Sequence, residues 1–159
     1  MTLLELRKRY GLSQTQASQA VGVPLRTYIR YETNEDYGNA LKRDAMAEKL
    51  SKRFEITETH GKLTVEEIKR TAFRLFTEEY EGKIEFCYLF GSYAKGYATG
   101  KSDVDLCVST SLTGFQFFGL VEKLRNELHK KVDLIRWGDL EKNFDLVNEI
   151  IKDGIKIYG

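Results

Sequence analysis

In the second half of this chain, a glycine-serine pair is followed, after ten residues, by two aspartates. The pair is Gly91-Ser92, and the aspartates are Asp103 and Asp105. The apolar run Ile84–Phe90 before the pair predicts a buried strand that ends where the glycine permits a sharp turn. A turn that opens a helix directs several backbone N–H groups and the helix dipole at one point. We therefore expect an anion-binding site at this turn, with Lys95 supplying a further positive charge.

The two aspartates occupy alternate positions of a second predicted strand. Side chains at i and i+2 of a strand share a face, so Asp103 and Asp105 point the same way, and Val104, Leu106 and Val108 take the opposite face. Two neighbouring carboxylates repel each other unless a cation lies between them, and oxygen ligands suit Mg²⁺. A solvated pair of acids at the start of a strand is the alternative.

A third aspartate, Asp133, interrupts a short apolar strand further along the chain. Between the strands, residues 115–128 place apolar side chains at helical spacing. A strand, a helix and a strand form a crossover unit, which can set the third strand beside the second and Asp133 beside the other two acids. Asp133 is then a candidate general base or metal ligand. A surface ion pair with Lys130 or Lys131 is the alternative.

Together, these residues resemble the minimal nucleotidyltransferases (MNT) of the DNA polymerase beta superfamily over roughly residues 64–159. The resemblance implies that the Gly91-Ser92 turn binds a nucleoside triphosphate. It implies that Asp103, Asp105 and Asp133 hold two Mg²⁺ ions while a nucleoside monophosphate, with ATP as the favoured donor, passes to a hydroxyl. Members of this family commonly carry arginine where this chain has Lys95, and lysine lacks the planar fork that grips phosphate.

The first third of the chain has the pattern of a helix-turn-helix unit. Ser13 and Gln16 form a capping box, Gly22 supplies a turn, and Pro24 suits the first turn of the next helix. On that helix the spacing of Tyr28 and Tyr31 predicts that both face inward. Those residues resemble the phage-repressor-like XRE family over about residues 1–56. The resemblance implies that the second helix lies in the major groove of DNA, and the residues implied in the contact are Gln14, Leu25, Arg26 and Arg30. A helical interaction module without DNA contact is the alternative.

Composition bounds the organisation of the chain. Its 159 residues, 42% hydrophobic and 31% charged, suit one ordinary domain or two small ones, and no apolar run is long enough to span a bilayer. We expect an α+β chain: an all-helical helix-turn-helix domain (1–56), a polar linker (57–63) and a small mixed-sheet α/β nucleotidyltransferase domain (64–159). Cys87 and Cys107 are expected in the core, and the absence of a signal sequence predicts a cytoplasmic protein.

The charge of residues 1–56 and the resemblance to MNT proteins indicate which partners the chain binds. Residues 1–56 carry 10 Lys and Arg against 7 Asp and Glu, so one copy should bind operator DNA weakly and a homo- or hetero-oligomer is expected. The resemblance to MNT proteins implies an antitoxin that transfers AMP to a tyrosine of a HEPN ribonuclease toxin encoded nearby and represses their shared operon. Two alternatives remain open: a regulator that binds NTP or a partner without catalysis, and a nucleotidyltransferase acting on a small molecule or RNA.

Overall fold

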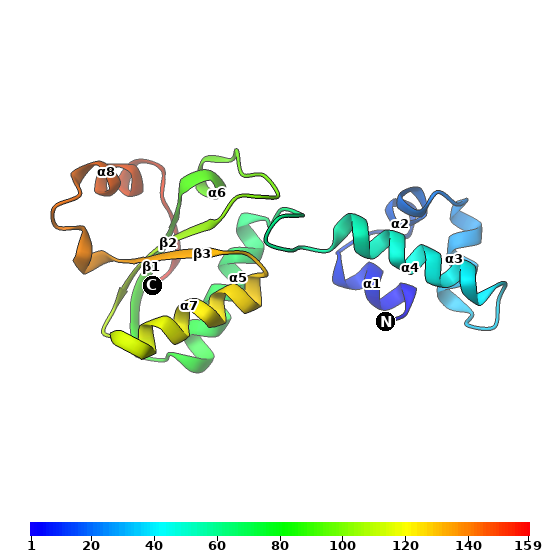
Figure 1. Cartoon of the computed structure of the whole chain (residues 1–159), viewed down its shortest axis with the longest axis horizontal. Coiled ribbons are helices and arrows are strands. Elements are labelled where there is room, and N and C mark those ends of the chain that lie inside the picture. The colour runs from blue at the N-terminus through cyan, green and yellow to red at the C-terminus, as the bar shows by residue number, and fades with distance from the viewer. The chain divides into compact units, whose positions relative to one another are not determined.

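A computed structural model describes residues 1–159, and the chain forms two compact units, Met1–Glu55 and Ile56–Gly159. The first unit contains only helices, and the second is built on a sheet (Figure 1). The predicted α+β class is therefore confirmed. None of the helices combines the length and apolarity needed to cross a membrane.

Four helices make up the N-terminal unit, and their ends follow local sequence signals. Ser13 and Gln16 form the predicted capping box, and Gly22 ends the second helix in the left-handed conformation, with φ 78°. As predicted, the side chains of Tyr28 and Tyr31 are buried in the core. The helices are α1 (Leu3–Arg9), α2 (Gln14–Val21), α3 (Leu25–Thr33) and α4 (Ala40–Phe54).

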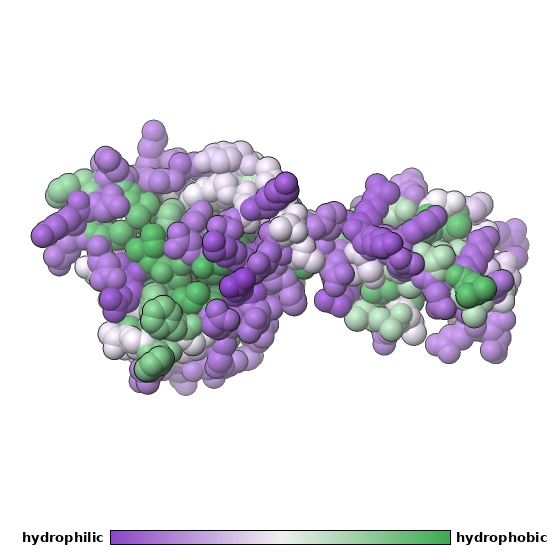
Figure 2. Space-filling model, in the orientation of Figure 1, coloured by the Kyte–Doolittle hydropathy of each residue, from purple (hydrophilic) through white to green (hydrophobic).

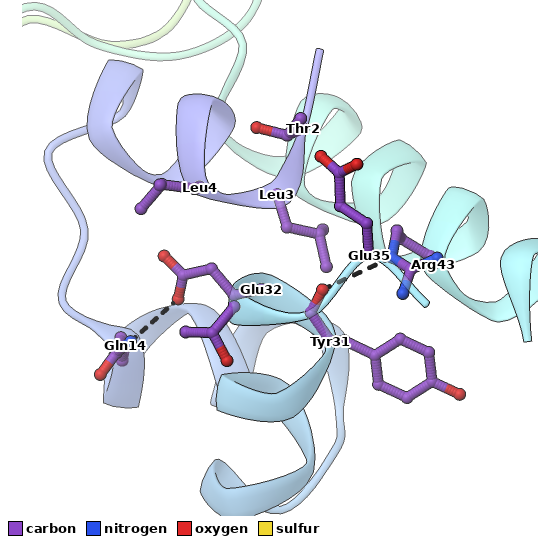
Figure 3. Close-up of a pocket in the computed structure, with 9 residues that line it drawn as sticks. Thr2, Leu3, Leu4, Gln14, Tyr31, Glu32, Glu35 and Arg43 are labelled. Atoms are coloured by element: carbon purple, nitrogen blue, oxygen red, sulfur yellow. Dashed lines mark hydrogen bonds between the residues drawn. The ribbon is translucent and has the colours of Figure 1, made fainter. Parts of the chain in front are cut away.

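A buried ion pair joins the first three helices of this unit. The Glu32 side chain of α3 has no exposed surface and accepts a hydrogen bond from Arg7 Nε of α1 at 2.6 Å. Its other carboxylate oxygen accepts one from Gln14 Nε2 of α2 at 3.1 Å, drawn as a dashed line in Figure 3. Charged hydrogen bonds out of water are strong, so this network sets how α1, α2 and α3 pack.

The second unit is a four-stranded mixed sheet in the order β3-β2-β1-β4. Strands β2 and β3 are parallel and joined by a helix, as the crossover predicts, whereas β1 is antiparallel to both of its neighbours. Helices α5 and α7 lie together on one side of the sheet, and α8 lies on the other (Figure 1). The elements are α5 (Val65–Glu79), β1 (Ile84–Phe90), α6 (Gly91–Lys95), β2 (Val104–Thr110), α7 (Gly114–Leu128), β3 (Val132–Arg136), the 3-10 turn η1 (Trp137–Leu140), α8 (Phe144–Asp153) and β4 (Ile155–Tyr158).

Two sequence predictions for this unit are confirmed, the buried cysteines and the helix over residues 115–128. Cys87 and Cys107 are free and buried, as expected. Residues 115–128 do form a helix, but its core side chains are Leu120, Leu124 and Leu128. Phe115 and Phe118, which share the helical spacing, are 94% and 66% exposed instead. Figure 2 shows hydrophobic surface gathered over the start of α7. The helical spacing of apolar residues predicts the helix, but it does not show which of those residues are buried and which are exposed near the helix end.

Candidate active site

Three neighbouring strands bring the predicted site residues into one row. Asp105 on β2 is the register partner of Asp133 on β3 and of Phe90 on β1, the residue before the Gly91 turn. Adjacent strands lie about 5 Å apart, so the row is compact. Asp103 directly precedes β2, and its charge acts on the Asp105 carboxylate. The structure therefore groups all three aspartates beside the Gly91-Ser92 turn.

Parity along the strands decides which face of the sheet carries the acids. Leu106 and Val108 of β2 point into the main core against α5 and α7. Asp105 alternates with them and shares its face with Cys107, which packs with Phe90 under η1 and α8. The candidate site thus lies on the side of the sheet that α8 covers, at the end where β1 stops.

The Asp105 carboxylate lies against the backbone of Gly91. Gly91 has a φ of 70°, and a Cβ added there would overlap Asp105 Oδ2. Burial, followed by the negative charges of Asp133, Asp103 and Glu149, raises the pKa of Asp105 to about 6. The ionised form of this carboxyl group is therefore unfavourable in the empty site, and a bound cation would stabilise it.

Lys95, predicted to contact phosphate, is held by an acid that sequence reasoning missed. Its Nζ lies 2.6 Å from Oε1 of Glu149 on α8, and this hydrogen bond raises the pKa of Lys95. Glu149 is thus a fourth acid at the site. Nothing in the sequence pattern distinguishes it, because only the packing of α8 over the sheet brings it there.

The donor set fits a divalent cation. No group of three or more His, Cys, Asp or Glu side chains in the chain stands ready to hold a metal ion. Nevertheless, the three aspartates supply only oxygen donors. The negative charges of Asp133 and Asp103 already act on Asp105. Hard cations such as Mg²⁺ prefer such carboxylate ligands and complete their shell with water and substrate phosphate.

Comparison with known proteins identifies the fold at this site. The model of the polymerase beta nucleotidyltransferase family matches residues 72–159, which include the turn and all three aspartates. The chain belongs to the polymerase beta nucleotidyltransferase family. A helix-turn-helix family model matches residues 3–59.

Relatives of this nucleotidyltransferase are found in Methanocaldococcus jannaschii. One, named "Putative protein adenylyltransferase MJ1379", is 36% identical over 75 residues, which are 45% of this chain and 73% of the relative. Another of the same description, MJ0128, is 35% identical over 86 residues, which are 51% of this chain and 86% of the relative.

Solved structures show a weaker likeness to the nucleotidyltransferase. A chain from the crystal structure of a toxin-antitoxin with AMP-PNP is 26% identical with a TM-score of 0.49, covering 57% of this chain and 73% of that one. A chain from a tri-AMPylated Shewanella oneidensis HEPN toxin in complex with MNT antitoxin is 23% identical with a TM-score of 0.45, covering 58% and 70%.

The four predicted DNA-contacting residues of the nucleotidyltransferase lie in the N-terminal unit. Leu25, Arg26 and Arg30 are exposed on α3, and the Arg30 guanidinium lies 5.7 Å from the ring centre of Tyr37. Gln14 begins α2 and donates to the buried Glu32. The first three are exposed at the surface, whereas the Gln14 side chain is already hydrogen-bonded to Glu32.

Replacing Gly91 with alanine should damage the nucleotidyltransferase in two ways. The left-handed backbone costs an alanine about 1–2 kcal/mol, and the new Cβ displaces Asp105. We expect transfer to fall by roughly 10²-fold, because small displacements of reacting groups have effects of that size. Gly96→Ala is a matched control, since its φ is 86° but nothing lies within 4 Å of an added Cβ. Equal losses in both variants would contradict a specific role for the contact with Asp105.

The raised pKa of Asp105 predicts how the stability of the metal-free nucleotidyltransferase depends on pH. The folded state holds the proton up to about pH 6, whereas the unfolded chain releases it near 3.8. Stability therefore falls as the pH rises through this window, by at most about 3 kcal/mol, and levels off above it. Urea unfolding in EDTA should show the fall in the wild type and not in Asp105→Asn. Parallel pH profiles of the two proteins would contradict it.

Proposed function

We propose that this nucleotidyltransferase is a Mg²⁺-dependent protein adenylyltransferase that acts as an antitoxin. It transfers AMP from ATP to a tyrosine of a HEPN ribonuclease toxin: the tyrosine oxygen bonds to the α-phosphorus, and pyrophosphate leaves. The observation that carries the proposal is the row formed by the Gly91 turn, Asp105 and Asp133 across three strands, with Asp103 beside it. That arrangement unites an anion-binding turn with a cation-binding acid cluster, as transfer from a nucleoside triphosphate requires.

Each group has a part in the proposed reaction. Backbone N–H groups at Gly91 and Ser92 bind the triphosphate, and Lys95 leaves Glu149 to join them. Asp103, Asp105 and Asp133 would hold two Mg²⁺ ions, which when bound neutralise the developing charge at phosphorus. Asp133 is exposed and also stands where it can take the proton of an incoming tyrosine hydroxyl.

A protein acceptor is supported by two observations. The relatives from Methanocaldococcus jannaschii are named as protein adenylyltransferases. On the chain itself, Phe115 and Phe118 form an exposed apolar surface, a feature typical of contacts with other proteins. The HEPN identity of the acceptor follows the resemblance of the catalytic motif to MNT proteins.

The acceptor can be mapped by mass spectrometry after incubating the chain with Mg²⁺, ATP and the co-encoded HEPN protein. We expect one AMP group on a tyrosine, loss of ribonuclease activity, and neither effect when that tyrosine is changed to phenylalanine. An unmodified partner alongside AMP-labelled tRNA or aminoglycoside would contradict the protein acceptor.

In the same proposal, residues 1–56 form a DNA-binding domain that represses the operon, residues 57–63 are a linker and residues 64–159 are the catalytic domain. The protein acts in the cytoplasm, and assembly with itself or with the toxin raises its affinity for the operator. The exposed Arg26 and Arg30 are placed to contact bases or phosphates.

Removing either arginine should weaken operator binding. We expect Arg26→Ala and Arg30→Ala each to reduce affinity by about tenfold in a gel-shift assay with the upstream region of the operon. Lys52→Ala, which removes an equal charge from the exposed surface of α4, is the control. Unchanged binding by both arginine variants would contradict the proposed groove contact.

A further inference from the structure

Lys130 is a fully buried lysine between α7 and β3, with an exposed fraction of 0%. Its Nζ donates to the carbonyl oxygen of Gly100 at 2.6 Å and to that of His60 at 3.2 Å. Burial lowers the pKa of Lys130, and the charge of Glu58 opposes that shift. A lysine is rarely buried so completely unless hydrogen bonds compensate its charge, as those to the two carbonyl oxygens do here.

One of its two acceptors belongs to the loop Gly96–Ser102, which joins the phosphate-binding turn to Asp103. This loop has internal order: Ser102 N donates to Thr99 O at 3.1 Å, and Thr99 N donates to Ser102 Oγ at 2.8 Å. Ala98 anchors the loop in the main core. The position of this loop therefore determines how the turn and the acid stand relative to each other.

The other acceptor belongs to the segment Thr57–Gly61, which precedes α5. Thr57 N donates to His60 O at 2.8 Å, and Glu58 forms an ion pair with Arg125 of α7. The loop lies directly on this segment, since a Cβ added to Gly100 would stand 3.2 Å from Gly61 N. Lys130 connects the loop and the segment, because its Nζ donates a hydrogen bond to one backbone carbonyl oxygen of each.

We propose that Lys130 is a positioning residue for nucleotide transfer, holding the loop Gly96–Ser102 against the segment Thr57–Gly61. Its side chain is fully buried and its Nζ is bonded to two backbone carbonyl oxygens, those of Gly100 and His60. Lys130 therefore acts through the loop and does not touch the nucleotide. The segment that leads out of the N-terminal unit is thus part of the support of the catalytic site. The link to nucleotide binding rests on the proposed function.

The test compares the full-length wild type with Lys130→Met, which keeps the length of the side chain but removes the charge and its donors. Titration calorimetry with Mg²⁺ and α,β-methylene-ATP should show at least tenfold weaker binding by the variant. Hydrogen exchange of the Lys101 and Ser102 amides should be at least tenfold faster without nucleotide. Lys131→Met, at the exposed neighbouring position, should match the wild type in both assays.

A second variant covers the case in which Lys130→Met does not fold. Gly100→Ala keeps the lysine but crowds Gly61, and it should produce the same two changes. Wild-type affinity and unchanged loop exchange in both variants would overturn the role of Lys130. If the wild type itself binds no nucleotide, the proposed function fails. In that case loop exchange tests separately whether Lys130 holds the loop Gly96–Ser102 in place: faster exchange in the variants supports that structural role, and unchanged exchange overturns it.

Discussion

Replacing Asp105 with asparagine is expected to reduce nucleotide transfer by roughly 10³-fold or more while making the metal-free protein more stable. Activity falls because a carboxylate at the centre of the acid row is lost. Stability rises because asparagine removes a charge that burial and the neighbouring acids destabilise, with a gain of about 1–3 kcal/mol near neutral pH. The Asp105 carboxylate is thus expected to be required for activity while lowering the stability of the metal-free protein.

The two effects are measured separately, by release of pyrophosphate and by urea unfolding in EDTA followed through Trp137. Asp145→Asn makes the same chemical change at an exposed position in the first turn of α8 and should alter neither strongly. Adding Mg²⁺ should raise the stability of the wild type and not that of Asp105→Asn. A variant that loses stability in EDTA would show that the ionised carboxylate holds the fold together.

Replacing Glu32 with glutamine should destabilise the N-terminal unit by about 3 kcal/mol, since one partner of a buried ion pair is lost and Arg7 keeps an uncompensated charge. The unit contains no tryptophan, so the two units can be followed apart. Far-ultraviolet circular dichroism reports helices of both units, whereas fluorescence reports Trp137 of the catalytic unit.

We expect the circular dichroism of Glu32→Gln to show an earlier transition for the N-terminal helices, with the fluorescence transition unchanged. Glu35→Gln is the control, because Glu35 is exposed close by in the chain. Identical transitions for Glu32→Gln and the wild type would mean that the pair with Arg7 does not stabilise the unit.

Much of the fold could be predicted because its signals are local. The apolar run Ile84–Phe90 coincides with β1. The crossover rule correctly predicted that β3 lies beside β2, which makes Asp133 the neighbour of Asp105. The capping box of Ser13 and Gln16 marked where α2 begins.

The rest of the site depends on which surfaces pack together, and no local pattern carries that information. Glu149 reaches Lys95 only because α8 lies over the sheet. From the sequence, Lys130 is a candidate surface ion-pair partner of Asp133, yet it is buried and its Nζ donates to the carbonyl oxygens of Gly100 and His60. Gln14 was predicted to contact DNA, but its side chain donates a hydrogen bond to the buried carboxylate of Glu32.

In the reaction that we propose, AMP, and not another part of ATP, passes to a protein at the row formed by Asp105 and Asp133, with Asp103 beside it. Its most direct test incubates the chain, Mg²⁺ and the co-encoded HEPN protein with ATP labelled on either the α- or the γ-phosphate, alongside Asp103→Asn/Asp105→Asn. We expect α-label on the partner, no γ-label, and no label with the double variant. Transfer of γ-label, or α-label that persists in the double variant, would contradict it.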